Sequence, residues 1–192
     1  KPIKTKEFNL FEKRSRFTDD TIMTLAIAKW LCDDKTSKEV LIKNLKYFGN
    51  KYPRAGYGAR FNNWFAQESC EPYGSWANGS AMRVSPCAWV ANSFEEAHNL
   101  AYTSAIVTHN HPEGVKGALA TSDAIYLAKI GASKDEIKNH VEVRYEYDLS
   151  RSLDHIRPWY DFDVSCAGSV PEAIICFLEA DSFENAIRNA IS

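Results

Sequence analysis

The chain has 192 residues, of which 45% are hydrophobic and 25% charged, a composition typical of a soluble globular domain and not of a disordered or collagen-like chain. Its formal net charge of −2 argues against a protein that binds nucleic-acid phosphates, since such domains usually carry a basic excess. No apolar run approaches the ~18 residues of a membrane-spanning helix, so no membrane segment is predicted.

Cysteine usage and the N-terminus predict the compartment. The five cysteines are an odd number without C-x-x-C spacing, which favours reduced thiols over a disulfide framework or a zinc site. The N-terminal Lys-Pro-Ile-Lys-Thr-Lys lacks a following apolar core, so it does not have the form of a signal peptide. We therefore expect a cytoplasmic protein. A length of 192 residues predicts one domain over residues 1–192.

The first predicted helix begins near Thr18 and ends near Asp33, because its apolar residues recur on one helical face. Its start carries four oxygen-bearing side chains in a row, Thr18, Asp19, Asp20 and Thr21. One such residue is an ordinary N-cap that accepts an unpaired amide hydrogen of the first turn. Two adjacent carboxylates between hydroxyls are also the oxygen donors that Mg²⁺ or Ca²⁺ binds. The stretch alone favours capping and leaves a metal site open.

The next elements are a predicted helix from Ser37 to Phe48 and an aromatic-rich loop over residues 51–75. Within this loop, a short helix is predicted at Arg60–Phe65. The rings of the loop either pin it to the core or line the rim of a binding cleft.

Several helices are predicted in the second half of the chain. Ser93 and Glu96 have the spacing of a capping box before a helix that ends at Ala105, and another helix runs from Pro112 to Gly131. A further helix begins at residues 132–136, and residues 141–147 fit either a strand or a distorted helix end.

Proline and serine mark the last two predicted helices. One is expected to open at Ser169 with Pro171 inside its first turn, where proline is favoured. The other begins at Ser182 and is amphipathic up to Ile191. The whole pattern predicts a mostly helical domain whose loops carry the chemistry-bearing residues.

Three later loop-to-helix junctions share features with the one at Thr18. In the first, Asn78-Gly79-Ser80 is either a common turn or a loop that points free amides at an anion, and Arg83 could equally be a buried ion-pair partner. In the second, His109 and His111 flank an asparagine before a helix.

The histidine pair has three interpretations. It could be half of a zinc site, a ligand contact through a neutral imidazole, or a helix cap. Zinc is disfavoured because no matching pair of His or Cys exists elsewhere in the sequence. In the third junction, residues 161–171, Cys166 is either a nucleophile or, more commonly, a buried structural cysteine. Four junctions of this kind suggest helix N-termini that converge on an anionic ligand.

Together, and in this order, the motifs resemble the ADP-ribosylglycohydrolase family, which includes the dinitrogenase reductase activating glycohydrolases and the ADP-ribosyl-acceptor hydrolases. The motifs are Phe-Thr-Asp-Asp-Thr-x-Met, Asn-Gly-Ser-Ala-Met-Arg-Val-Ser-Pro, Thr-His-Asn-His-Pro-Glu-Gly and Ser-Cys-x-Gly-Ser-Val-Pro-Glu-Ala. The resemblance covers nearly the whole chain. It implies an all-α orthogonal multi-helix bundle with a cleft that holds two Mg²⁺ ions, for which Mn²⁺ could substitute.

The resemblance also implies residue roles. Thr18, Asp19 and Asp20 would be metal ligands, with Asp19 and Asp20 catalytic. A larger set would bind ADP-ribose: Asn78, Gly79, Ser80, Met82, His109, His111, Ser165, Cys166, Gly168 and Ser169. An aromatic residue of the rim at residues 57–76 would stack on adenine. The implied activity is hydrolysis of the glycosidic bond between ADP-ribose and an acceptor, either a protein side chain or a small molecule.

Family members also carry a Gly-Asp helix before the matched region and a Gly-Gly-Asp-Ser/Thr-Asp-Thr motif after it. Neither is present here, so the resemblance implies a domain that is incomplete at both ends. Apolar faces that the absent helices would cover could drive self-association. The alternative function is therefore a non-catalytic ADP-ribose-binding or structural module with an incomplete metal site.

Overall fold

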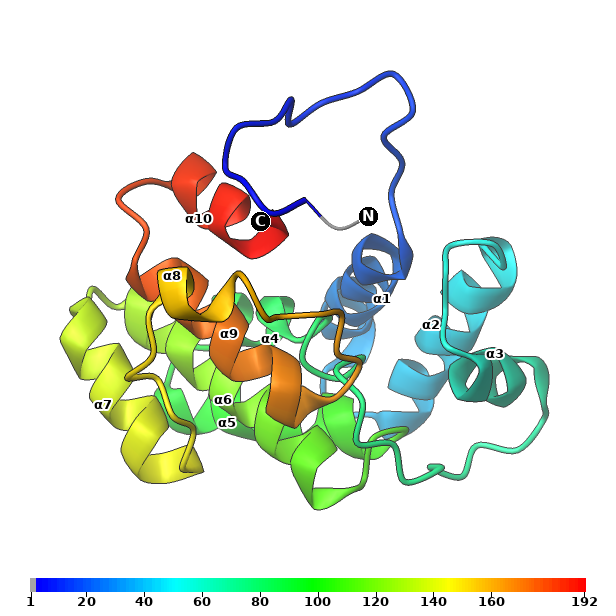
Figure 1. Cartoon of the computed structure of the whole chain (residues 1–192). Helices are drawn as coiled ribbons and strands as arrows, with labels where there is room; N and C mark the ends of the chain where they lie inside the picture. Colours follow the sequence, from blue (N-terminus) through cyan, green and yellow to red (C-terminus); the bar gives the residue numbers. More distant parts are fainter. Residues whose placement is uncertain (1–2) are drawn as a thin grey trace.

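Residues 3–192, the part of the chain that the computed structural model describes, form ten helices joined by loops (Figure 1). Their bounds are α1 Asp19–Asp34, α2 Lys38–Lys51, α3 Ala59–Ala66, α4 Ser85–Val90, α5 Phe94–Ile106, α6 Pro112–Lys129, α7 Lys134–Tyr145, α8 Leu153–Ile156, α9 Cys166–Leu178 and α10 Phe183–Ile191. An isolated antiparallel bridge joins Ala77 to Ser165, and no strand forms in these residues. The predicted all-α class is confirmed.

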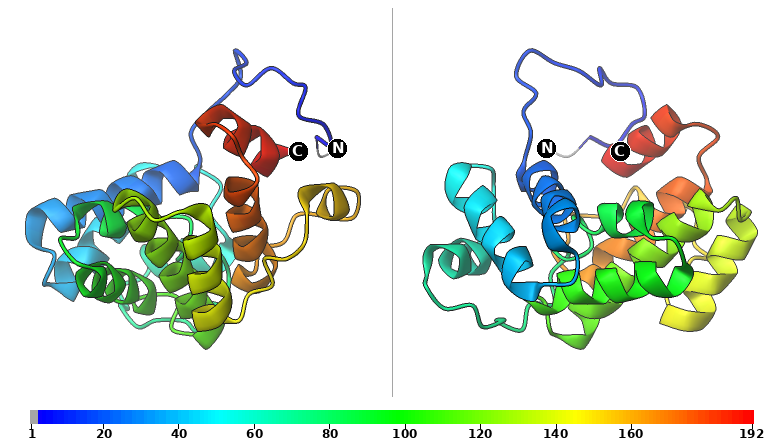
Figure 2. Two further views of the ribbon diagram at one scale, coloured as in Figure 1. Left: turned by 90° about the vertical axis from the view of Figure 1, so that its left-hand side faces the viewer. Right: turned by 180° about the vertical axis from the view of Figure 1, so that it is seen from behind.

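Helix α6 is the centre of the bundle, since it packs against α4, α5, α7 and α9. Pro112 fits its first turn, where a missing N–H costs no hydrogen bond, and Nδ1 of His111 accepts a hydrogen bond from the Glu113 amide (3.1 Å). The buried face of α6 lets its neighbours approach closely because it consists largely of small residues: Gly114, Gly117, Ala118, Ala120, Ser122 and Ala124. The bundle around α6 is seen from the side and from behind in Figure 2.

Two large apolar cores stabilise the bundle. One joins α1, α2 and α3 to α5 and includes the fully buried Trp30, Ile27 and Leu41. The other joins α6, α7 and α9 around Ile137 and Val141. Burial of each large aliphatic or aromatic side chain contributes about 1.5–3 kcal/mol, and α6 supplies residues to both cores. The boundary between the two cores is where the cleft described below opens.

The segment before α1 extends away from the bundle and returns beside α10 (Figures 1 and 2). Arg188 of α10 donates hydrogen bonds to the backbone carbonyls of Lys6 and Phe8, both at 2.8 Å. This contact brings the two ends of the described chain together.

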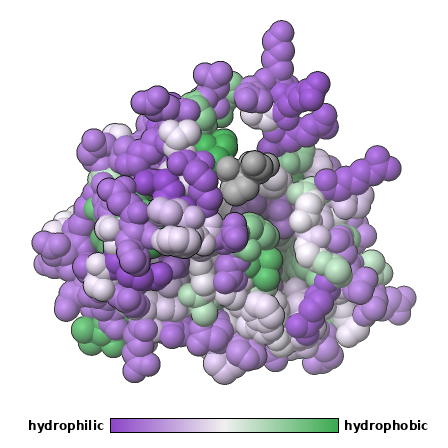
Figure 3. All heavy atoms as spheres, in the orientation of Figure 1, coloured by the Kyte–Doolittle hydropathy of each residue, from purple (hydrophilic) through white to green (hydrophobic). Residues whose placement is uncertain are grey.

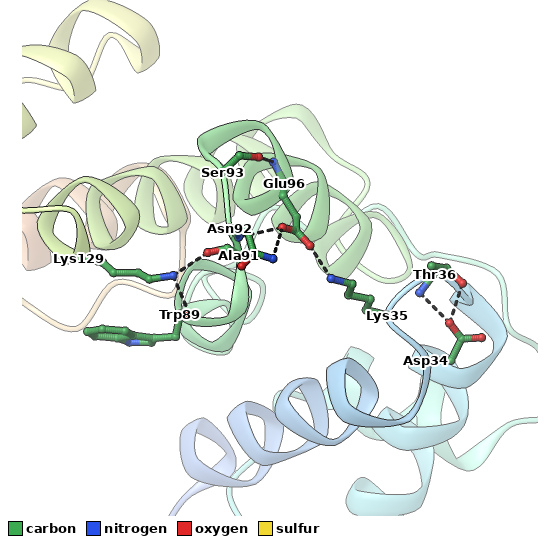
Figure 4. Close-up of polar contacts among 9 residues, drawn as sticks. All are labelled: Asp34, Lys35, Thr36, Trp89, Ala91, Asn92, Ser93, Glu96 and Lys129. Carbon is green, nitrogen blue, oxygen red and sulfur yellow. Dashed lines mark hydrogen bonds and ion pairs between the residues drawn. The ribbon is translucent and has the colours of Figure 1, made fainter.

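Polar contacts tie the α4–α5 connection to its neighbours (Figure 4). Lys129 at the end of α6 donates to the carbonyls of Trp89 (2.8 Å) and Ala91 (2.6 Å), and Lys35 forms an ion pair with Glu96. The capping box predicted at Ser93 is half formed. Ser93 accepts a hydrogen bond from the Glu96 amide, but the Glu96 carboxylate accepts from the Asn92 amide instead of that of Ser93.

The predicted start of α9 is wrong. The helix begins at Cys166, three residues before the predicted start, because Ser165 caps it by accepting a hydrogen bond from the Gly168 amide (2.9 Å). Pro171 therefore lies inside the helix instead of in its first turn.

The 141–147 region is the end of α7, which Glu146 terminates with a left-handed φ of 54°. Among the described residues, no helix has the length and apolarity to cross a bilayer.

Candidate active site

A cleft of about 1020 Å³ lies between the two cores. Its walls come from the start of α1, from α3, from the segment 73–85, and from α6 and α9. Apolar side chains of α6 and α9 form much of one wall, including Ala124, Ile125, Val170, Ile174 and Phe177. Figure 3, which has the orientation of Figure 1, shows apolar side chains gathered near the centre of the face that it draws. The size and lining are those of a site for a ligand with an apolar part.

All four predicted junctions contribute residues to the cleft. The members of the predicted site that line it are Asp19, Asp20, Asn78, Gly79, Met82, His109 and Ser169. The other members do not line it: Thr18, Ser80, His111, Ser165, Cys166 and Gly168. Segments that are up to 150 residues apart in the sequence therefore meet around one space, as convergence on one ligand requires.

The start of α1 presents its oxygens at the rim of the cleft. The Thr18 hydroxyl donates to Oδ2 of Asp20 (2.7 Å), so Thr18, although it is the N-cap residue, makes no side-chain cap hydrogen bond. The Asp19 amide is paired instead with the Ala55 carbonyl (2.8 Å). Burial, and secondly the negative charge of Asp20, raise the pKa of the Asp19 carboxyl. The cap interpretation of the Thr18 side chain is thus wrong, and two adjacent carboxyls face the cleft without a cationic partner among the described residues.

The side chains of Thr18, Asp19 and Asp20 suit a magnesium ion chemically, since all their donor atoms are hard oxygens. They fit it only in part, because they supply few of the six oxygens that Mg²⁺ takes and all come from one helix end. Within residues 3–192, no group of three or more His, Cys, Asp or Glu side chains is placed to hold a metal. The zinc interpretation of His109 and His111 accordingly lacks a third ligand.

Two hydrogen bonds join the junction at Asn78 to the junction at residues 161–171. The Asn78 amide donates to the Val164 carbonyl (2.8 Å), and its side-chain Nδ2 donates to the Ser169 hydroxyl (3.1 Å). The Ser80 hydroxyl is fully buried and donates to the Gly114 carbonyl of α6 (2.7 Å). Ser80 therefore holds the segment against α6 from behind the wall of the cleft.

Cys166 also lies behind the wall. Its thiol is fully buried and approaches the Ala77 carbonyl (3.3 Å), and burial raises its pKa to about 11. A thiol that stays protonated at neutral pH is a poor nucleophile, so the structural interpretation of Cys166 is the supported one.

His109 is a deeply buried polar residue of the cleft, with 3% of its surface exposed. Its Nδ1 lies 2.7 Å from the Thr108 hydroxyl, which accepts a hydrogen bond from Nη2 of Arg83 (2.8 Å). Burial, and then the charges of Arg83 and Arg60, lower the pKa of His109 well below its usual value. The imidazole is therefore neutral at pH 7.

Arg83 is a buried cation next to the cleft. Burial lowers its pKa to about 10, so it remains charged at neutral pH. It forms no ion pair within the described part of the chain, and its Nε has no hydrogen-bond partner there. A buried charge without a counter-ion favours an anionic ligand in the adjacent space. The suggested alternative, a buried ion pair, does not form.

Several lining residues were not singled out from the sequence. Arg60 of α3 lies over the Tyr73 ring, 5.0 Å from its centroid, and Phe177 of α9 lines the cleft. The aromatic content of residues 51–75 did indicate a rim, and Phe61, Tyr73 and Trp76 line the cleft. No local pattern indicates Arg60 or Phe177, because their place depends on how α3 and α9 pack.

Comparison with known proteins relates the whole chain to one family. The model of the ADP-ribosylglycohydrolase family matches residues 2–192. The ADP-ribosylhydrolase ARH3 of Mus musculus is 31% identical over 160 residues, which cover 72% of this chain and 42% of the mouse protein. The Homo sapiens ARH3 is 31% identical over 137 residues, covering 62% of this chain and 37% of the human protein. The chain thus spans less than half the length of these curated relatives.

A solved structure described as an "ADP-ribosylglycohydrolase-related protein complex" has the same fold, with a TM-score of 0.71. It is 19% identical in sequence, and the match covers 92% of this chain and 64% of the other. The four motifs, the helical bundle and the family match agree. The chain belongs to the ADP-ribosylglycohydrolase family.

Proposed function

We propose that this chain forms the ADP-ribose cleft of a hydrolase that cleaves the glycosidic bond between ADP-ribose and an acceptor, either a protein side chain or a small molecule. The observation that carries the proposal is that four separate motifs of the family border one cleft of about 1020 Å³. The names of the relatives, ADP-ribosylhydrolases, support the same reaction class.

The charges around the cleft support an anionic ligand. Arg83 and Arg60 contribute positive charge, and the neutral His109 offers a ring nitrogen beside Gly79. A diphosphate would be stabilised by these groups, as phosphates are by arginine. The apolar wall of α6 and α9 suits a nucleobase, which needs apolar surface more than charge.

The carboxylates suit the chemistry of glycosidic cleavage. Breaking the C1 bond of ribose passes through an oxocarbenium-like transition state that carries positive charge. Asp19 and Asp20 at the rim would stabilise that charge electrostatically. Contacts to the remote nucleotide would hold C1 in position, so that binding energy is used at the reacting centre.

Thr18, Asp19 and Asp20 would hold Mg²⁺, or Mn²⁺ in its place, with water completing the coordination. Bound magnesium would supply a water of lowered pKa and orientation of the ribose hydroxyls. Burial, and secondly the charge of Asp20, raise the pKa of the Asp19 carboxyl, and a bound cation would offset both effects. The family resemblance implies two ions in the complete site.

The free state of all five cysteines supports the predicted cytoplasmic setting.

The test is release of ADP-ribose from an ADP-ribosylated protein incubated with this chain, with Mg²⁺ or with a chelator. We expect release that depends on Mg²⁺ and is lost in Asp19→Ala plus Asp20→Ala. Release that is equal in the chelator would contradict the metal role. The absence of release with Mg²⁺ would contradict hydrolysis by this chain.

The second candidate is a non-catalytic ADP-ribose-binding module. It is favoured by the absence, among residues 3–192, of a three-ligand group for a metal. Calorimetry separates the two candidates. The module predicts ADP-ribose binding that is independent of Mg²⁺ together with no release, whereas the hydrolase predicts both Mg²⁺ dependence and release.

A further inference from the structure

A buried chain of hydrogen bonds runs from Arg83 through Thr108 to His109. Nη2 of Arg83 lies 2.8 Å from the Thr108 hydroxyl oxygen, and that oxygen lies 2.7 Å from Nδ1 of His109. Nη2 also donates to the Ser104 carbonyl (2.6 Å), which fixes the guanidinium in place. Arg83 is 1% exposed, Thr108 is fully buried and His109 is 3% exposed, so water does not compete for these groups.

The direction of each hydrogen bond follows from what each group can donate. A guanidinium has only donors, so the Thr108 oxygen must accept from Arg83. The hydroxyl then has its own hydrogen to place, and Nδ1 of His109 is the acceptor it contacts. A neutral imidazole that accepts at Nδ1 carries its hydrogen on Nε2. This chain of hydrogen bonds from Arg83 through Thr108 to His109, called the relay below, therefore has one internally consistent arrangement of hydrogens.

The other ring nitrogen, Nε2, lies close to Gly79. A Cβ built on Gly79 would lie 3.0 Å from Nε2 of His109, and both residues line the cleft. We infer that Arg83 and Thr108 are positioning residues that hold His109 as the Nε2–H tautomer, so that a neutral N–H donor faces an anionic oxygen of the ligand. This inference rests on the proposed function for the identity of that ligand, but not for the tautomer itself.

Charge and tautomer act together. The lowered pKa of His109 keeps the ring uncharged, so only one of its two nitrogens carries hydrogen. Which nitrogen carries it decides whether the ring offers a hydrogen-bond donor or an acceptor to the cleft. With hydrogen on Nδ1, the ring would present a lone pair to a phosphate oxygen, and both groups would be acceptors. The relay prevents this, since the Thr108 hydroxyl hydrogen occupies the Nδ1 side.

Nitrogen-15 NMR of histidine-labelled protein without ligand tests the tautomer directly. The signals of His109 are identified by their loss in His109→Gln. We expect wild type to show the Nε2–H form, Thr108→Ser to keep it because the hydroxyl is retained, and Thr108→Val to shift the ring toward the Nδ1–H form. An Nδ1–H ring in wild type, or an unchanged ring in Thr108→Val, would overturn the inference. If Thr108→Val does not fold, the wild-type and Thr108→Ser spectra still decide the tautomer.

Calorimetry with two probes tests the consequence. Thr108→Val should weaken ADP-ribose binding about tenfold and leave adenosine binding unchanged, since adenosine has no diphosphate. Thr108→Ser should bind ADP-ribose like wild type. An equal loss for both probes would indicate a general structural effect and contradict the positioning role. If wild type binds no ADP-ribose, the proposed function fails, while the NMR result still decides the tautomer.

Discussion

The inner wall of the cleft and its α1 rim are built in opposite ways. At the inner wall, Arg83 and, behind it, Ser80 are buried and donate hydrogen bonds to backbone carbonyls of α5 and α6. At the rim, Asp20 is exposed, Asp19 is half-buried, and the only side-chain pairing among Thr18, Asp19 and Asp20 is the bond from Thr18 to Asp20. The inner wall is preorganised by packing, whereas the rim consists of like charges that a bound cation would organise. Mutations on the two sides should therefore affect different properties.

The largest effect is expected where α6 meets the inner wall. A Cβ on Gly114 would lie 2.4 Å from the Ser75 carbonyl oxygen, and this backbone atom cannot rotate away. Gly114→Ala should lower the free energy of unfolding by about 3 kcal/mol, measured by chemical denaturation. Gly58→Ala is the matched control, since a Cβ there meets nothing within 4 Å. Equal stability of the two variants would contradict a close-packed inner wall.

The rim should lose metal binding with little loss of stability. Asp19→Ala plus Asp20→Ala removes both carboxylates of the proposed magnesium site and should abolish Mg²⁺ binding by calorimetry, at a cost of ~1 kcal/mol in folding. Asp33→Ala plus Asp34→Ala, the adjacent pair at the other end of α1, should leave Mg²⁺ binding unchanged. If the first variant binds Mg²⁺ normally, the carboxylates at the start of α1 are not ligands.

Gly79 provides an intermediate case, since it belongs to the inner wall but touches the ligand space. Gly79→Ala would push on the buried His109 ring, 3.0 Å from the added Cβ. ADP-ribose affinity should fall about tenfold, while the midpoint of denaturation changes less than in Gly114→Ala. An unchanged affinity would show that His109 does not contact the ligand.

The smallest effect concerns Asp19 and pH. A raised carboxyl pKa means that the folded state favours the protonated form, so the contribution of Asp19 to stability is present at low pH and is lost as pH rises through its folded pKa. Asp19→Asn should thus be slightly more stable than wild type at pH 7 without metal. Solvent screening limits the gain to about 0.5 kcal/mol, and it should vanish near pH 3. Denaturation at both pH values measures this gain, and lower stability of the variant at pH 7 would contradict a raised pKa of Asp19 in the folded state.

Local patterns predicted much of the helical order and the four junctions, because caps and breakers act over a few residues. Ser133 and Ser182 begin helices as expected. The predicted start of α9 is wrong because the Ser165 cap, and not the preference of Pro171 for a first turn, sets the residue at which the helix begins. The burial of Ser80 and Cys166 depends on how they pack against α6, and spacing along the chain carries no sign of that contact.

Titration of ADP-ribose into this chain by calorimetry, with and without Mg²⁺, tests the central claim most directly. The cleft predicts binding of one ADP-ribose per chain, made tighter by Mg²⁺ through Asp19 and Asp20. The absence of binding in both conditions would contradict the account, because the preorganised inner wall should recognise the nucleotide before any metal is added.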